Sequence, residues 1–441
     1  MTSTPLRAAI AVVVLLAAFA VTGVRVWRKY QADGGAVATA DFRDVIYWPT
    51  RAVAVGLNPY DSDTTSPAAD GGPKYRARFP AQQMFPLYSP LLFALFFPFA
   101  TPPYEVAAGL WLVFGAGLLV LYSYALWRLA DRRPTVEAVC YLAAVMLVLQ
   151  SGRPTFVSGQ TSLFLALAVL VAIACRGAWS GVALALTSIK PTFGLPLGLA
   201  LLARGEWRTV LVGWGLGLVL GVAGLALIFS RAGDLDRVGE VLTSNQHELE
   251  SDPDADARTS SVRLDSVAAF ERLLNAGDAP RKLLSYGLVA APTLAAAYLL
   301  GRRRENAEAA LLADALTFVA PVAMIYHLTY DGLALWGALA LLILSPRERF
   351  RRLSLQLRHA IAGCIFFTQI NCLMTPTVIG WFDALGISAR TMPPALVNGT
   401  WTAVSIANGA ALWIAVLLIL VIAIRWDSAT TSRRLGNDGL R

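Results

Sequence analysis

The 441-residue chain is poor in charge, in cysteine and in histidine. Charged side chains make up 15% of it, against about 25% in soluble globular proteins. Its four cysteines lie in apolar stretches without metal-ligand spacing, so a disulfide framework and a cysteine metal site are excluded. Three histidines are too few for a His-rich metal centre. The 35 glycines and 23 prolines follow no repeat period, which excludes a collagen-like chain.

Apolar sequence is abundant instead, at 56% hydrophobic residues. A membrane-spanning helix needs about 20 mostly apolar residues, and runs near that length recur at 8–24, 104–127, 135–150, 160–175, 209–229, 284–300, 308–325, 329–345, 359–379 and 399–424. Residues 86–100 are short and Pro-rich, which predicts a membrane-dipping segment. Residues 178–203 contain Lys190, Pro191 and Pro196, which predicts two half-helices. We therefore expect an all-α polytopic membrane protein, a bundle of about 10–13 hydrophobic segments.

Basic residues gather in the short loops between these runs. Short loops rich in Arg and Lys stay in the cytoplasm, and the clusters are Arg128, Arg132 and Arg133; Arg204 and Arg208; Arg302 to Arg304; Arg347 to Arg358; and Arg425, Arg433 and Arg434. With these loops in the cytoplasm, the polar segments 28–85 and 230–282 lie outside. Much of the net charge of +8 then lies at the membrane surface, so we expect membrane lipids as partners and no nucleic acid.

The expected organisation has six parts. They are a retained first transmembrane helix (1–27), an outer loop with the membrane-dipping segment (28–103), a transmembrane bundle with a broken helix near 190 (104–229), a second outer loop (230–282), the C-terminal transmembrane helices (283–425) and a disordered cytoplasmic tail (426–441). The second outer loop is either part of an acceptor site or a solvated connector.

Two carboxylates follow the first span closely. In a helix starting near Asp41, Asp41 and Asp44 share a face at i and i+3. A carboxylate at a membrane–water boundary can serve as general base for a hydroxyl acceptor. The alternative is helix capping, because Asp satisfies free backbone N–H groups at a helix N-terminus.

Two further polar side chains stand at the entry of apolar segments. Tyr88 lies in Phe-Pro-Leu-Tyr-Ser-Pro, the proline-spaced entry into the segment 86–100. Gln160 opens the run 160–175. Gln160 either hydrogen-bonds a sugar or phosphate, or caps its helix.

Lys190 lies within an apolar stretch, where a charge costs about 2.5–3.5 kcal/mol at a helix centre. Pro191 breaks the helix directly after it, and irregular backbone at membrane depth is tolerated where it lines a cavity. A cation beside a broken helix suits an anionic head group such as a lipid phosphate. The alternative is that Lys190 snorkels to the interface.

His327 is the histidine in an apolar context, between two runs. Its neighbours Tyr326, Tyr330 and Asp331 form a polar cluster that packing alone does not explain. A hydrogen-bonded structural histidine is the alternative to a functional site.

In chain order, these motifs resemble glycosyltransferase family 87 of the GT-C superfamily, whose polytopic members use polyprenyl-phosphate-linked sugars. The resemblance covers about residues 38–345 and is carried by Asp41-Phe42, Tyr47, Gly56 to Asp61, Tyr88-Ser89-Pro90, Gly159-Gln160, Lys190-Pro191-Thr192 and Tyr326-His327. The chain departs from the family pattern at Ser89, Ser162 and Phe193, where Pro, Asn and Pro are usual.

The resemblance implies inverting transfer of a mannose or arabinofuranose type of sugar from a polyprenyl-phosphate donor to a glycolipid or glycan acceptor. It implies Asp41 as the general base, with Asp44 as the rival, and Lys190 as the ligand of the donor phosphate. His327 would be a second phosphate or sugar contact, and the pocket would be lined by Gln160, Tyr88 and Tyr326. No cofactor and no metal ion is expected.

The expected location is the plasma membrane, with the site on the extracytoplasmic side. Two other functions remain open from the residues alone. One is a transporter or flippase of lipid-linked sugars, because Lys190 and Pro191 could mark a broken-helix substrate site. The other is an envelope polymer ligase, which also uses polyprenyl donors.

Overall fold

The computed structural model describes residues 5–32, 39–56, 58–60, 88–232, 240, 243, 263–370 and 394–438. These parts of the chain are helical and contain no strand, apart from an isolated antiparallel bridge between Arg263 and Leu328. The all-α polytopic fold class expected from composition is confirmed.

Six helices among the described residues are long and apolar enough to cross a membrane. They are α1 (Pro5–Ala32), α5 (Tyr104–Leu129), α11 (Trp207–Ala232), α14 (Ala279–Gly301), α15 (Ala307–Met324) and α19 (Pro394–Asp438). At 1.5 Å per residue, even the 18-residue α15 is about 27 Å long, close to the thickness of a bilayer's hydrocarbon core.

Shorter apolar elements fill the space between these helices. They are α4 (Leu91–Phe96) with η2 (Phe97–Ala100), α8 (Ser162–Ala174), α9 (Ala178–Thr187), α10 (Pro191–Ala203), and the run formed by η3 (Thr329–Leu335), α16 (Trp336–Leu339) and η4 (Ala340–Leu344). The remaining elements are η1 (Phe42–Tyr47), α2 (Trp48–Ala54), α6 (Val136–Val148), α7 (Gly152–Ser158), α13 (Ser266–Leu273), η5 (Arg347–Arg349) and α17 (Leu355–Ile370).

Several expected runs have a different shape in the structure. The run 135–150 is the first half of a pair, α6 and α7, bent by 71°. Gly152 permits this bend, since a Cβ there would lie 1.9 Å from the Met146 carbonyl oxygen. The run 359–379 corresponds to α17, and its part beyond Ile370 lies outside the described residues. In the tail, α19 stays helical to Asp438, where sequence predicted disorder.

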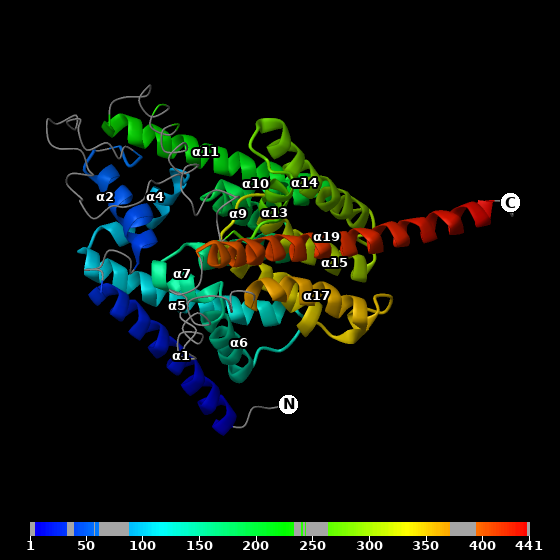
Figure 1. Cartoon of the computed structure of the whole chain (residues 1–441), viewed down its shortest axis with the longest axis horizontal. Coiled ribbons are helices and arrows are strands. Elements are labelled where there is room, and N and C mark those ends of the chain that lie inside the picture. Colours follow the sequence, from blue (N-terminus) through cyan, green and yellow to red (C-terminus); the bar gives the residue numbers. More distant parts are fainter. Residues whose placement is uncertain are drawn as a thin grey trace.

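The helices differ in how much of their surface other helices cover. Of its apolar window, α15 buries 83%, whereas α11 buries 11%. In Figure 1, α15 runs through the middle of the bundle, α11 along one edge and α1 along another, where it packs on α6 and α7. Exposed aliphatic side chains on α11, such as Leu211 and Leu218, are stable only against lipid or another apolar partner.

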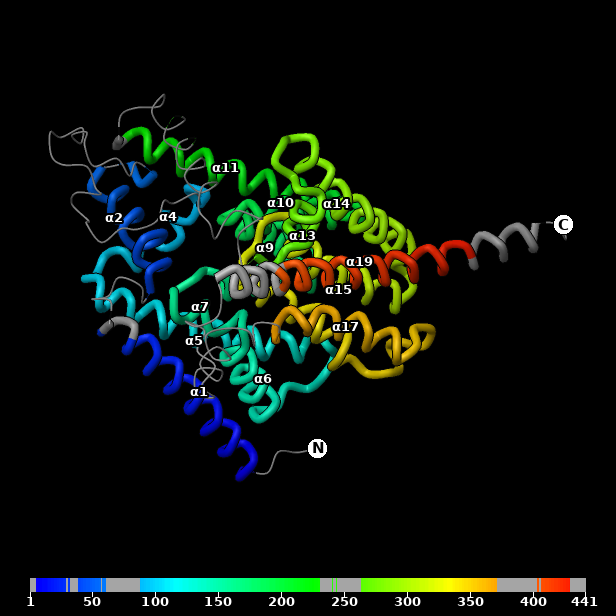
Figure 2. The backbone as a smooth tube through the Cα atoms, in the orientation of Figure 1, coloured from blue at the N-terminus to red at the C-terminus, as the bar shows by residue number. Residues whose placement is uncertain are grey.

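Basic side chains gather at one end of the bundle, which we call the basic end. Their contacts there are Arg204 with Asp314 (2.7 Å), Arg303 with Asp427 (3.2 Å), Arg132 with the Leu344 carbonyl (2.8 Å), and Arg358 with the Leu342, Ile343 and Ser345 carbonyls. Figure 2 shows the described end of α19 projecting beyond its neighbours on the same side. Helix α10 begins after Lys190 and ends near Arg204, so Lys190 lies a helix length from the basic end.

Candidate active site

Asp41 lies at the start of η1, at the end of the bundle away from the basic end. Its carboxylate lies beside the side chains of Ser158 and Gln160 and within electrostatic reach of Lys190. Burial raises the pKa of Asp41 to about 6, against the opposing effect of these three groups. Asp41 nevertheless keeps part of its surface exposed.

Gly159 brings Gln160 to this carboxylate. It ends α7 in the left-handed region, with φ of 75°, and a Cβ there would lie 2.7 Å from Cβ of Phe42. A glycine is the residue that tolerates both the backbone conformation and the close approach. The turn between α7 and α8 therefore packs directly on the residue that follows Asp41.

Asp44 has a different environment from Asp41. Its carboxylate is fully buried and forms a two-pronged ion pair with the adjacent Arg43, at 2.7 and 2.8 Å. The residues after Asp41 form a π-helix rather than an α-helix, so the i, i+3 spacing does not give the two carboxylates the same partners. Asp41 faces polar donors of α7 and the α7–α8 turn, whereas Asp44 faces Arg43.

Lys190 lies in the break between α9 and α10. Its backbone is extended, with φ of −115° and ψ of 99°, and Pro191 is the first residue of α10. This is the conformation that a residue before proline prefers, and proline is well suited to the first helical position. Its ammonium lies 2.6 Å from Oδ2 of Asp331, and the Lys190 side chain is 12% exposed.

Two aromatic rings flank the Lys190 ammonium. The ring of Tyr330 lies 5.2 Å away and the ring of Phe193 lies 5.7 Å away. Ring faces attract a cation and exclude water from it. The ammonium has three N–H donors, and of these the structure assigns one to Asp331.

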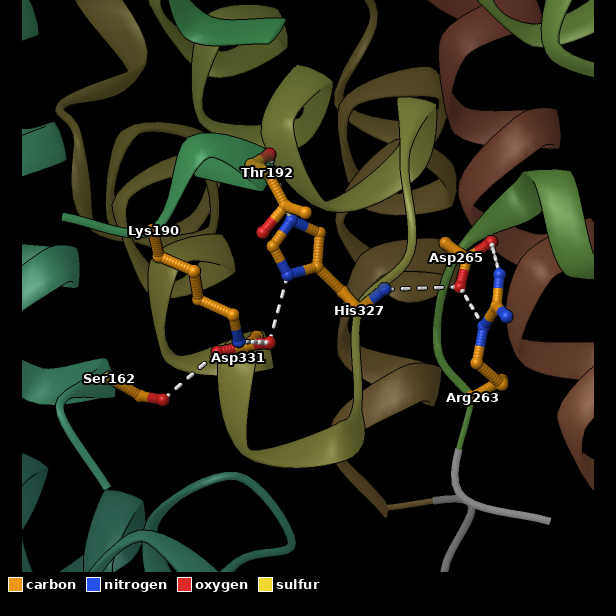
Figure 3. Close-up of polar contacts among 7 residues, drawn as sticks. All are labelled: Ser162, Lys190, Thr192, Arg263, Asp265, His327 and Asp331. Atoms are coloured by element: carbon orange, nitrogen blue, oxygen red, sulfur yellow. Dashed lines mark hydrogen bonds and ion pairs between the residues drawn. The ribbon is translucent and has the colours of Figure 1, made fainter. Parts of the chain in front are cut away.

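Asp331 holds Lys190 and His327 together (Figure 3). Its Oδ2 contacts Nζ of Lys190 at 2.6 Å and Nδ1 of His327 at 2.8 Å, and Oδ1 accepts a hydrogen bond from Ser162 at 3.0 Å. Sequence reasoning placed Asp331 in a polar cluster but not among the site residues. The signal in the sequence was its spacing of four residues from His327. The chain turns through η3 between the two residues, so that their side chains meet.

His327 is fully buried, and both of its ring nitrogens are occupied. Nε2 lies 3.2 Å from the Thr192 carbonyl oxygen, and Phe193 packs edge-on against the ring at 4.4 Å. The carbonyl can only accept a hydrogen bond, so Nε2 carries a proton. His327 thus connects Asp331 to the first turn of α10, and its side chain has no exposed surface for a substrate.

The tyrosines complete the surroundings of the two carboxylates. Tyr88 lies beside Thr161, and burial followed by the charges of Asp331 and Asp41 raises its pKa. Its position is fixed because the next residue, Ser89, donates its N–H to the Ile189 carbonyl at 3.0 Å. Tyr330 lies within reach of the same two carboxylates and of Tyr88 and Tyr326.

The structure therefore brings most of the expected site residues to one place. Asp41, Gln160, Tyr88, Tyr326 and Lys190 lie near one another, His327 is buried beside Asp331, and Asp44 is held by Arg43. No group of three or more His, Cys, Asp or Glu suited to a metal ion occurs among the described residues.

Sequence reasoning missed two further charged residues, Arg263 and Asp265, which are buried beside His327. They follow a long polar stretch of the second outer loop, and nothing in their spacing marks them. The one local signal is Asp265 itself, because an Asp before a helix predicts an N-cap, and its side chain accepts the N–H of Ala268 at the start of α13.

The fold and the site together define a polytopic membrane protein in which an acid and a cation lie near each other at one end of a helical bundle. The model of glycosyltransferase family 87 matches residues 86–325, more than half of the chain, and the chain belongs to that family. The matched segment includes Tyr88, Gln160 and Lys190 and ends before Tyr326. Neither the curated proteins nor the solved structures contain a match.

Proposed function

We propose that this glycosyltransferase transfers a sugar of the mannose or arabinofuranose type, with inversion, from a polyprenyl-phosphate donor to a glycolipid or polysaccharide acceptor. The observation that carries the proposal is that Asp41, a partly exposed acid, lies within electrostatic reach of Lys190, a largely buried cation. The two side chains supply the two requirements of the reaction, a base and a counter-charge for the leaving group.

Asp41 acts as the general base. With a pKa raised to about 6, it is ionised at neutral pH and still basic enough to take a proton, which is the compromise that general-base catalysis needs. The acceptor oxygen forms a bond to the anomeric carbon while its proton passes to Asp41. The neighbouring polar side chains of Ser158 and Gln160 favour the ionised form of the carboxylate.

Lys190 stabilises the leaving group. As the bond from the anomeric carbon to the phosphate oxygen breaks, its electron pair leaves with polyprenyl phosphate. The two N–H groups of Lys190 that do not face Asp331 can bond the phosphate oxygens, and Asp331 fixes the ammonium at 2.6 Å so that little reorganisation is needed. A charge preorganised in a site with little water acts more strongly than one in solvent.

The outer side of the plasma membrane is the proposed location of the site. Loops rich in arginine stay in the cytoplasm, and the basic end lies a helix length away from Lys190. This orientation gives the site access to donors and acceptors of the outer leaflet.

The test is a turnover assay on the purified protein in detergent. A polyprenyl-phosphate sugar and a glycolipid acceptor are supplied, and released polyprenyl phosphate is measured. We expect Asp41→Asn to lower kcat by about 10²–10⁴-fold, and Asp44→Asn to retain more activity if it folds. The reverse order would move the base to Asp44.

Two other outcomes would overturn the proposal. Movement of lipid-linked sugar across liposome membranes without turnover would assign the broken helix at Lys190 to a transporter. Joining of preformed polymers, rather than transfer of one sugar, would assign the protein to the polymer ligases.

A further inference from the structure

The end of the second outer loop enters the protein interior beside the proposed site. Arg263 and Leu328 form an antiparallel bridge, and the N–H of Leu264 donates to the His327 carbonyl at 2.8 Å. Arg263 and Asp265 have 4% and 0% of their surface exposed. Burying two charges is unfavourable unless they are well paired, because both lose their hydration. The pairing of Arg263 with Asp265 therefore fixes the position of this segment.

Asp265 accepts four hydrogen bonds. Its partners are the Arg263 guanidinium (2.6 and 2.9 Å), the Ala268 N–H (2.8 Å) and the His327 N–H (3.2 Å). The two bonds from Arg263 pair the carboxylate with a positive charge, and the bond from Ala268 caps the start of α13. The bond from the His327 N–H fixes the backbone of the residue that carries the imidazole ring. Figure 3 shows the chain of contacts from Arg263 through Asp265 and His327 to Asp331 and Lys190.

Arg263 also holds the residue before His327. Its guanidinium lies over the Tyr326 ring, 4.5 Å from the ring centre. A guanidinium stacked on a ring and paired with a carboxylate is restricted in both translation and rotation. The two neighbours Tyr326 and His327 are therefore fixed by one ion pair from a distant part of the sequence.

We propose that Arg263 and Asp265 are a positioning pair for the donor phosphate. They orient Tyr326 and His327, and through the hydrogen bond from His327 to Asp331 they set the place of the Lys190 ammonium. The role rests on the proposed function, because Lys190 is taken there as the ligand of the phosphate. It gives the second outer loop a part in binding the donor rather than the acceptor.

Asp265→Asn tests the pair with little change of shape. The amide has one accepting oxygen in place of two, and its NH₂ group faces a donor of Arg263 together with the N–H of either Ala268 or His327. We expect the KM for the polyprenyl-phosphate sugar to rise about tenfold, while the KM for the acceptor stays within twofold of the wild-type value. Arg263→Lys, which keeps the charge but loses the two-pronged pair, should raise the donor KM by a smaller factor.

Asp314→Asn is the matched control. Asp314 is also paired with an arginine, Arg204 at 2.7 Å, but at the basic end. A merely structural ion pair would lower thermal stability in this variant and leave both KM values unchanged. The same pattern in Asp265→Asn, stability lowered with the donor KM unchanged, would overturn the positioning role.

A binding measurement separates this proposal from the proposed function. The affinity of each variant for polyprenyl phosphate is measured in detergent without any sugar donor. Weaker binding by Asp265→Asn and Arg263→Lys than by Asp314→Asn supports the pair, even if no donor sugar turns over. Equal binding by the wild-type protein and all three variants overturns the pair and leaves the proposed function standing where turnover is seen. A wild-type protein that neither binds the phosphate nor turns over overturns both.

Discussion

The contacts of Asp331 predict that removing Asp331 and removing Lys190 have unequal costs in stability. Lys190 is ion-paired with Asp331 and lies within electrostatic reach of Asp41, whereas Asp331 is shared by Lys190, His327 and Ser162. Asp331→Asn removes the charge that both neighbours face. Lys190→Met instead leaves Asp331 with His327 and Ser162.

The expected magnitudes follow from this asymmetry. Removing one partner of a buried ion pair costs about 3–5 kcal/mol when the remaining charge is left without compensation, and this applies to Asp331→Asn. Lys190→Met loses a hydrogen bond between charged groups, which contributes about 1.5–3 kcal/mol. The methionine keeps the side-chain length between the rings of Phe193 and Tyr330.

The assay is denaturant unfolding in detergent micelles, with the free energy of unfolding compared among the variants. Lys282→Met, at an exposed lysine of α14, is the control for loss of a positive charge and should be close to the wild-type protein. The double variant Lys190→Met/Asp331→Asn should lose less than the two single variants added together, because the pair has already been broken. Equal destabilisation by Lys190→Met and Asp331→Asn, with strict additivity in the double variant, would refute the reasoning.

Three further predictions concern Asp41 and its support. The rate should rise with pH through about 6, because Asp41 must lose its proton to act as base and its pKa is raised to about 6; a rate independent of pH between 5 and 7.5 would contradict this. Asp41→Asn should stabilise the protein at pH 7.5, by at most about 3 kcal/mol, and by less, about 1 kcal/mol, at pH 4.5. The sign follows because the raised pKa makes the ionised form of Asp41 costly in the folded state. This cost decreases as the pH falls from about 6 towards the ordinary value of 3.8, and unfolding at both pH values measures it. Gly159→Ala should destabilise by about 1–3 kcal/mol and lower turnover, since φ is 75° and the new Cβ would meet Phe42. Gly205→Ala, at a glycine that follows α10, has a positive φ of 84° and meets no atom within 4 Å, so it separates the backbone strain from the clash in the same unfolding assay.

The architecture followed from short-range properties of the chain. Apolar runs such as 104–127 and 209–229 became α5 and α11 with nearly the same bounds, because a long helix in lipid satisfies its own backbone groups. Runs interrupted by glycine or proline were harder to interpret. The bend after α6 depends on the approach of Gly152 to the Met146 carbonyl, a contact that hydropathy does not report.

For the site, the sequence singled out residues but not their partners. The sequence indicated Lys190 because a cation in an apolar stretch is costly. It indicated Pro191 because a proline interrupts a helix. The roles of Asp41, Lys190 and His327 stay predictions, as does the choice between Asp41 and Asp44. Their surroundings now differ: Asp41 is partly exposed beside Lys190, and Asp44 is fully buried against Arg43.

By itself, the sequence determined that this is a helical membrane protein and where its costly polar groups lie, because hydropathy and helix breaking act within a few residues. Only the tertiary structure decided that Asp331 pairs with Lys190, 141 positions away, and that Asp265 reaches His327, 62 positions away. Such pairs form where helices from distant parts of the chain pack together, and no local pattern encodes which buried charge will meet which.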